Sequence, residues 1–216
     1  MTQLVTTSEL QLIEEYTMQT MAVPQEVLIE RAAMAVQEVI GAGNFDLSNV
    51  LVLAGLGNNG ADGVALARLL HLQGIDVSLQ FVGNLNRAKD SVQHQLKIAE
   101  HCGLTRSEKS DFQKATLIID AIFGTGLNNT IPDGLQKMMR AANHADNSVV
   151  AIDVPTGISA NTGEVLGSAL KAKSTVTFGY EKVGLTKGGG KKFSGEVIVK
   201  DIGLLTPENF IFSQAK

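Results

Sequence analysis

The chain has 216 residues, with 18 Lys or Arg against 22 Asp or Glu, so its formal net charge is −4 at pH 7. This mild acidity gives no electrostatic footprint for nucleic acid, and the single cysteine, Cys102, excludes an internal disulfide framework and a cysteine-built zinc site. No stretch approaches the roughly 20 apolar residues of a membrane span, and the N-terminus lacks a signal-peptide pattern, so we expect one cytoplasmic domain over residues 1–216.

Two helices are expected before the first strand. Ser8 and Gln11 have the spacing of a capping box, which would begin the first helix. Pro24 suits the first position of the second helix, and Gly41 would end it. Further helices are predicted where apolar residues recur at helical spacing, around residues 62–72, 92–99 and 135–142.

Six short apolar runs rich in β-branched residues predict strands. Most are continuous rather than alternating, which is typical of strands buried on both faces of a sheet. The second run alternates, which places it nearer an edge. Because strands and helices alternate along the chain, we expect an α/β fold with a mostly parallel, doubly wound sheet. The six runs are Val50–Leu53, Ile75–Val82, Ala115–Asp120, Ser148–Asp153, Ser174–Phe178 and Glu196–Val199.

In such a sheet a ligand sits beyond the carboxyl ends of the strands, so the segments that follow the strands are candidate sites. The first, Gly55–Gly63, follows the earliest strand and opens a helix. Its glycines allow close backbone approach, and free N–H groups at a helix start favour anions. A tight turn with Asp62 as helix cap is the plain alternative, but Asn58 and Asn59 favour a binding loop.

Two aspartates end apolar strands, where a carboxylate is costly unless it is paired or liganded. Asp120 precedes Gly124–Thr130, a polar segment whose plain alternative is a long surface loop. Asp153 precedes a Pro-Thr-Gly turn that contains Thr156, and it could simply cap that turn. If these groups share one cavity with the asparagine pair, their oxygen atoms suit Mg²⁺, Ca²⁺ or an alkali ion. A glycine- and lysine-rich run, Gly188–Lys192, would either close over an anion or form a flexible hairpin tip.

The ordered set of segments resembles the NAD(P)H-hydrate epimerases, the YjeF N-terminal domain family, from Ser8 to about Leu204. Each segment alone is moderately specific, and their order and spacing carry the resemblance. The matching segments are Glu30–Ala33, Gly57–Gly63, Asp120–Leu127, Asp153–Gly157, Thr175–Gly179, Gly195–Val197 and Asp201–Gly203.

The resemblance implies a Rossmann-like three-layer αβα sandwich, a homodimer, and epimerisation of hydrated NADH or NADPH at C6 of the nicotinamide ring. It also implies one K⁺ per subunit with side-chain ligands Asn59, Asp120 and Thr156. Many members carry a fused dehydratase domain, for which 216 residues leave no room, so a separate dehydratase is implied. The implied substrate-binding residues are Asn58, Asn59, Gly60, Ala61, Asp62, Gly124, Thr125, Gly126, Leu127, Asn128, Asn129, Thr130 and Asp153.

Two positions depart from the family's usual pattern. Ala61 replaces a glycine, and its methyl group would crowd the ligand if that position needed a positive φ or a close approach of the backbone. Thr156 stands where serine is frequent and keeps the hydroxyl donor.

The implied reaction needs a group that gives and takes a proton. A carbon that bears a hydroxyl beside a ring nitrogen can lose hydroxide to give an iminium, or open to an aldehyde, and both routes need proton transfer. No Lys or His lies within the three segments after the strands, so we assign the catalytic role to Asp153.

Two rival functions stay open at this point. The same fold could be a non-catalytic module that binds nucleotides, RNA or a protein, although an acidic chain with two Tyr and no Trp is a poor stacking platform for RNA. An NAD-dependent dehydrogenase is disfavoured, because the second strand ends in Phe81-Val82-Gly83-Asn84 without an acidic ribose-binding residue.

Overall fold

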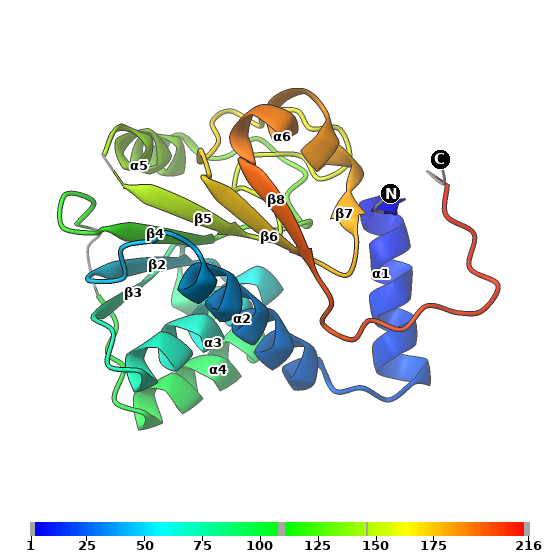
Figure 1. The fold of residues 1–216 in the computed structure, drawn as a ribbon, viewed down its shortest axis with the longest axis horizontal. Coiled ribbons are helices and arrows are strands. Elements are labelled where there is room, and N and C mark those ends of the chain that lie inside the picture. The colour runs from blue at the N-terminus through cyan, green and yellow to red at the C-terminus, as the bar shows by residue number, and fades with distance from the viewer. Residues whose placement is uncertain (1–2, 108–110, 146, 214–216) are drawn as a thin grey trace.

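The computed structural model describes residues 3–107, 111–145 and 147–213. A six-stranded sheet lies between two layers of helices (Figure 1), and every strand pairing in it is parallel. The predicted three-layer α/β fold is therefore confirmed. The strands of the sheet are β2 (Val50–Ala54), β3 (Val77–Phe81), β4 (Leu117–Ala121), β5 (Ser148–Ile152), β6 (Ser174–Phe178) and β8 (Glu196–Lys200).

Helices α2, α3 and α4 cover one face of the sheet, and α5 and α6 cover the other (Figure 1). The helices are α1 (Thr7–Glu15), α2 (Gln25–Ala42), α3 (Asn58–Leu72), α4 (Asp90–His101), α5 (Asp133–His144) and α6 (Gly188–Phe193). Shorter elements are the strands β1 (Leu4–Val5) and β7 (Glu181–Lys182), the π-helical turn η1 (Tyr16–Thr20) and the 3₁₀ turns η2 (Leu85–Arg87) and η3 (Val183–Thr186). In the described part of the chain, no helix combines the length and apolarity needed to cross a membrane.

The strand order is β3-β2-β4-β5-β6-β8, with β3 at an edge as its alternating pattern predicted. The order reverses between β2 and β4, so the segments that leave these two strands diverge to opposite faces of the sheet. Such a reversal leaves a crevice at the carboxyl ends of the strands, which is where α/β proteins bind their ligands.

The central strands are continuous apolar runs because they fill two cores. In β2, Val50, Val52 and Ala54 join the core under α2, α3 and α4, whereas Leu51 and Leu53 join the core under α5. Successive side chains of a strand point to opposite faces, so both sets must be apolar. The sheet that carries the strand ends is thus anchored from both sides.

The ends of the first two helices differ from the prediction. The capping box is formed by Thr6 and Glu9 rather than by Ser8 and Gln11: Thr6 has an extended backbone, and its N–H donates to the Glu9 carboxylate at 2.7 Å. The helix α2 continues past Gly41 and ends at Ala42, because the N–H of Gly43 still bonds to a carbonyl of the last turn.

The run Gly188–Lys192 forms neither a loop over a ligand nor a hairpin tip. It is the helix α6, and a Cβ at Gly190 would overlap the carbonyl of Gly184. Its glycines therefore permit close packing of α6 on η3. The prediction was wrong because a run of glycines usually indicates a loop or turn, whereas here the glycines permit close contact between α6 and η3.

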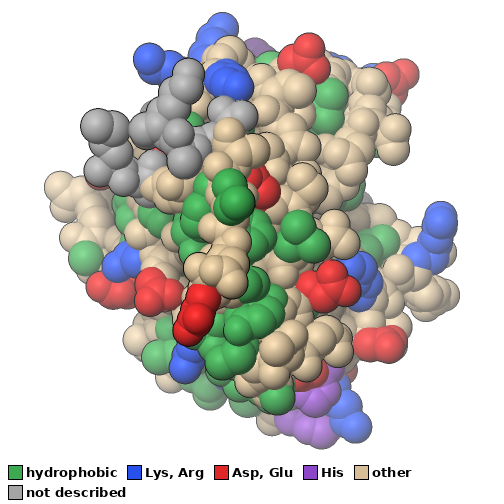
Figure 2. All heavy atoms as spheres, turned by 90° about the vertical axis from the view of Figure 1, so that its right-hand side faces the viewer, with side chains coloured by type: hydrophobic (Ala, Val, Ile, Leu, Met, Phe, Trp, Pro, Cys, Tyr) green, Lys and Arg blue, Asp and Glu red, His purple; other side chains and the backbone are tan. Residues whose placement is uncertain are grey.

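The N-terminal and C-terminal segments lie close together at α1 and η1. The segment after β8 returns across α1 (Figure 1), and the Leu205 N–H donates to Thr17 Oγ1 of η1 at 2.8 Å. The strand β1 pairs in parallel with β7, with Val5 opposite Lys182. Figure 2 shows hydrophobic side chains gathered on this face. Leu12 of α1 is 56% exposed, and Ile211 of the segment after β8 is 88% exposed.

Candidate active site

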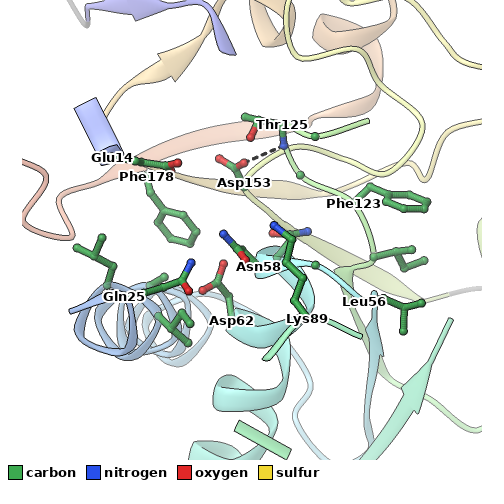
Figure 3. A pocket seen from close by; sticks show the side chains of 18 of the residues that line it. Glu14, Gln25, Leu56, Asn58, Asp62, Lys89, Phe123, Thr125, Asp153 and Phe178 are labelled. Carbon is green, nitrogen blue, oxygen red and sulfur yellow. Dashed lines mark hydrogen bonds between the residues drawn. The ribbon is translucent and has the colours of Figure 1, made fainter. Parts of the chain in front are cut away.

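A cavity of about 900 Å³ opens where the strand order reverses, at the carboxyl ends of β2, β4 and β5 (Figure 3). Polar side chains reach it from several elements, including Asp62 of α3, Lys89 before α4 and Asp153 after β5. Leu28 and Ile29 of α2 line an apolar side. A concave, largely apolar cavity with a few converging polar groups is typical of a small-molecule site.

The segment Gly55–Gly63 is a tight turn from β2 into α3. A side chain at Gly55 would overlap the carbonyl of Ile122, and one at Gly60 would overlap the carbonyl of Gly55. Both positions therefore require glycine, and the close packing brings the start of α3 against the end of β4. The helix starts at Asn58 and so presents its first turn to the cavity.

The five predicted binding residues at the start of α3 divide into two groups. Asn58, Asn59 and Asp62 line the cavity. Gly60 and Ala61 are buried outside the lining, and the methyl group of Ala61 packs into the core under α2 and α4. Ala61 lies in regular helix without positive φ, so the backbone condition under which its methyl group would crowd the ligand is not met. Asp62 lies inside α3 and does not cap it, since the helix begins four residues earlier.

Asp120 and Thr156, two of the predicted metal ligands, are in direct contact. Asp120 is fully buried in β4; its Oδ1 accepts a hydrogen bond from Thr156 Oγ1 at 2.6 Å, and its Oδ2 accepts one from the Thr156 N–H at 2.7 Å. Burial raises the pKa of Asp120 to about 6, although the bonds from Thr156 and from the Ile122 N–H act in the lowering direction. A positive charge at this position would stabilise the ionised form.

Asn59 supplies the third predicted ligand and fits a cation site. Its Oδ1 and Nδ2 are buried, and neither has a hydrogen-bond partner in the described ranges. A Cβ at Gly124 would lie 3.4 Å from Asn59 Oδ1, and the neighbouring Phe123 N–H donates to Thr156 Oγ1 at 3.1 Å. Asn59 and the Asp120–Thr156 pair thus flank one short segment. Amide, hydroxyl and carboxylate oxygens together suit a hard cation.

The described side chains include no cluster of the kind that binds a soft or borderline metal. Within residues 3–107, 111–145 and 147–213, no group of three or more His, Cys, Asp or Glu side chains is arranged to hold a metal ion. The donors beside Asn59 are amide, hydroxyl and carboxylate groups, so an ion there would be one that prefers oxygen ligands.

The predicted segment after β4 enters the cavity only in its first part. Gly124, Thr125 and Gly126 line the cavity. Leu127 turns away and packs against the core under α5. Asn128, Asn129 and Thr130 are exposed and lie outside the lining, because the chain then leads away to α5.

Asp153 is held in an unusual backbone conformation by several contacts. Its φ is +68°, a left-handed value that is uncommon for residues other than glycine. Its Oδ2 accepts the Thr125 N–H at 3.2 Å, and its Oδ1 accepts the Thr177 hydroxyl at 3.2 Å. Strained backbone that persists at a cavity marks a functional constraint.

Lys182 is a site residue that the sequence analysis missed. It is 0% exposed, and its Nζ lies 2.6 Å from Asp153 Oδ1, 2.8 Å from Thr177 Oγ1 and 3.0 Å from the Phe178 carbonyl oxygen. Asp153 was chosen partly because no lysine lies in the three segments, but β7 brings one from outside them. The available signal was the Glu181-Lys182 pair, which stands directly before Val183-Gly184-Leu185.

Two further carboxyl groups share the cavity with Asp153. Burial and then the charge of Asp153 raise the pKa of Glu14 to about 7, against the opposing effect of Lys182 and Lys89. Burial, followed by Asp153 and Glu14, raises the pKa of Asp62 well above its ordinary value. Glu14 was not among the predicted site residues. Perturbed pKa values that cluster in one cavity are typical of an active site.

Comparison with known proteins agrees with this geometry. The family described as "YjeF-related protein N-terminus" matches residues 25–184. An NAD(P)H-hydrate epimerase of Leuconostoc mesenteroides is 69% identical over 213 residues, which are 99% of this chain and 96% of the relative. One of Weissella koreensis is 53% identical over 208 residues, 96% of this chain and 94% of the relative.

A solved structure shows the same fold. The crystal structure of yeast YNL200c has a TM-score of 0.73 and 21% sequence identity, with 85% of this chain and 83% of that chain covered. The family match spans most of the chain and includes the turn into α3 and the ends of β4 and β5. The chain therefore belongs to the family of YjeF-related protein N-terminal domains.

Proposed function

We propose that this protein is an NAD(P)H-hydrate epimerase, which interconverts the R and S forms of hydrated NADH or NADPH at C6 of the nicotinamide ring. Relatives of that name match almost the full chain at up to 69% identity. The observation that carries the proposal is the Asp153 carboxylate, which is ion-paired to a buried lysine and lines a cavity of about 900 Å³. Such a carboxylate is poised for proton transfer to a bound substrate.

Asp153 is the proposed catalytic residue, and its two oxygens differ. Oδ1 accepts bonds from Lys182 and Thr177, whereas Oδ2 accepts only the Thr125 N–H among the described residues. Oδ2 therefore keeps lone-pair capacity for the substrate hydroxyl or for water. Both the iminium route and the ring-opened route need proton transfer at this oxygen.

A potassium ion is part of the proposal. Asn59 would hold it through the buried Oδ1 that has no protein partner in the described chain, together with Asp120 and Thr156. When bound, the ion supplies positive charge that stabilises negative charge on nearby oxygen atoms. The residues themselves keep the segment after β4 in place, since Thr156 bonds to both Asp120 and the Phe123 N–H.

The hydrated dinucleotide would occupy the cavity along α3 and the segment after β4. Asn58 and Asp62 offer polar groups on one side, and Gly124–Gly126 offer backbone on the other. Gly60 and Ala61 would act indirectly by supporting the turn. Asn128–Thr130, outside the lining, would contact only a part of the dinucleotide that extends beyond the cavity.

The expected partners complete the proposal. Epimerisation makes both hydrate forms available to a separate dehydratase, and the reaction would take place in the cytoplasm, where the thiol of Cys102 stays reduced. A homodimer is also proposed, and light scattering coupled to size-exclusion chromatography would measure it. Exposed apolar side chains such as Leu12 and Ile211 give such a contact available surface.

The test is direct epimer exchange. Purified protein is mixed with one resolved epimer of hydrated NADH, and separately of hydrated NADPH, in potassium buffer, and the epimer ratio is followed by chromatography. We expect exchange far above the spontaneous rate, a loss of at least about 100-fold in Asp153→Asn, and no change in Asp111→Asn, an exposed control near the start of β4. No acceleration with either hydrate would refute the enzyme and favour a non-catalytic binding module.

A further inference from the structure

The helix α1 and the turn η1 direct an ionisable side chain into the cavity (Figure 3). Leu10, Glu14 and Met18 are spaced four residues apart, and all three line the cavity. Residues at this spacing share one face of a helix. The Glu14 carboxyl group therefore lies between two apolar side chains, where water solvates a charge poorly.

Glu14 differs from Asp153 in its surroundings. Asp153 has an ion pair and two hydrogen bonds, whereas the Glu14 carboxyl has no hydrogen bond or ion pair within the described chain. Its position is nevertheless fixed, because Thr6 and Glu9 cap the start of α1 and Thr17 Oγ1 donates to the Ile13 carbonyl at 2.8 Å. Glu14 is thus held at the cavity and free to interact with whatever fills it.

Charged groups of four other elements act on Glu14. Asp153 follows β5, Lys182 lies in β7, Lys89 precedes α4, and Asp62 lies in α3. Burial and the negative charge of Asp153 keep the pKa of Glu14 near neutrality, at about 7. The cavity thus combines an ion-paired carboxylate with a carboxyl group that still carries a proton near neutral pH, the usual arrangement of an acid and a base.

We propose that Glu14 is a second catalytic residue, the general acid that protonates the departing C6 hydroxyl while Asp153 serves as the base for the incoming water. The inference rests on the proposed epimerase function. An epimerase must handle a hydroxyl on either face of the ring, and two proton-transferring groups on different elements meet that requirement without turning the bound ring over.

The step balances without any further reactant. The C6–O bond breaks with its electron pair moving to oxygen, the Glu14 proton joins that oxygen to form water, and the lone pair of the ring nitrogen forms the C=N bond of an iminium. Water then adds to C6 from the other face, its proton passes to Asp153, and the C=N pair returns to nitrogen. Glu14 ends as the carboxylate and Asp153 as the acid, which is the state required for the reverse epimerisation.

The main test compares Glu14→Gln with Glu15→Gln. Both variants replace a carboxylate on the same helix by an amide of equal size, but Glu15 is exposed and lies outside the cavity. We expect Glu14→Gln to lose at least about 100-fold in exchange rate and Glu15→Gln to match wild type. The wild-type rate should fall as pH rises through about 7, where Glu14 loses its proton, and Glu14→Gln should lack this decline.

Two further measurements separate chemistry from folding. Glu14→Asp keeps an acid that reaches less far, so it should be slower than wild type but retain a decline on the alkaline side. In water labelled with heavy oxygen, each epimerisation by wild type should place solvent oxygen at C6, because the original hydroxyl leaves as water.

The outcomes of these experiments distinguish the proposed role of Glu14 from the proposed epimerase activity. An inactive wild type would overturn the epimerase itself. An active wild type whose Glu14→Gln variant keeps both its rate and its alkaline decline would overturn only the role of Glu14. Epimerisation without incorporation of solvent oxygen would also overturn it, since the departing group would then never become free water.

Discussion

Replacing Lys182 with methionine would remove the ammonium group that anchors Asp153. Methionine approximates the length of the aliphatic stem of lysine but carries no charge and no N–H. The variant loses the 2.6 Å contact with Asp153 Oδ1 and the hydrogen bonds to Thr177 Oγ1 and the Phe178 carbonyl. The experiment therefore asks how much the fold and the reaction depend on one buried ion pair.

The expected loss of stability follows from the burial of the two partners. Removing one member of a buried pair costs about 3–5 kcal/mol, because the other charge stays buried without its counterion. The Asp153 side chain is 13% exposed and keeps the Thr125 and Thr177 bonds, so we expect the lower end of that range. In a chain of this size about 3 kcal/mol corresponds to a fall in Tm of about 6–12 °C.

The assay is a double-mutant cycle. Urea unfolding gives the free energy of unfolding for wild type, Lys182→Met, Asp153→Asn and the double variant. The double variant leaves no unpaired charge, so it should be about 1–3 kcal/mol more stable than the sum of the single losses predicts.

Additivity would refute this reasoning. If the two single losses add within about 0.5 kcal/mol, the pair contributes no coupling, and the contact seen in the structure is energetically neutral. A Lys182→Met variant as stable as wild type at every pH would lead to the same conclusion. Epimer exchange measured on the folded variants reports separately whether Lys182 orients Asp153 for catalysis.

Three other changes test the site. Gly124→Ala puts a Cβ 2.8 Å from Oδ2 of Asp153, the proposed base, so substrate affinity should fall at least about 10-fold in equilibrium binding. The control is Gly41→Ala, whose Cβ meets open space, so its substrate affinity should equal that of wild type. Thr156→Val removes the 2.6 Å bond to Asp120, which should cost about 1–3 kcal/mol in urea unfolding and raise the K⁺ concentration for half-maximal rate. Glu14 has a pKa of about 7 in the folded state against an ordinary 4.5, so its contribution to stability is present below about pH 4.5 and lost as pH rises through about 7. Glu14→Gln should therefore gain stability relative to wild type between about pH 5 and pH 8 in urea unfolding.

The sheet was predictable because its signal is local. The continuous apolar runs of β2 and β4 follow from burial on both faces, and the predicted bounds differ from the observed ones by at most two residues. The strands β1 and β7 were missed because each has two residues and its partner lies far along the chain, as Leu4 and Glu181 do. A strand of two residues is too short to show the apolar pattern by which a strand is recognised in a sequence.

The candidate site was predictable where its residues follow strands. Asp120 lies near the end of β4, Asp153 directly follows β5, and Asn59 lies in the first turn of the helix after β2, so the rule for open α/β sheets brings them to the same edge of the sheet. Glu14 and Lys182 come from a helix and a short strand outside the sheet, and only the tertiary fold carries them there. The sequence pattern therefore predicted the site residues that follow strands of the sheet, and it missed Glu14 and Lys182, which come from other elements.

The parallel pairing of β1 with β7 fixes the relative positions of Glu14 and Asp153, the two proposed proton-transferring residues. Val5 lies opposite Lys182, whose ammonium holds Asp153, and α1 starts two residues after Val5 and carries Glu14. Adding or deleting one residue between Val5 and Glu14 would turn the side chain by about 100° around the helix axis, away from the cavity. The position of the Glu14 carboxyl group relative to the nicotinamide ring is thus set by the number of residues between Val5 and Glu14. We expect an insertion or deletion there to leave the six-stranded sheet folded but to abolish epimerisation.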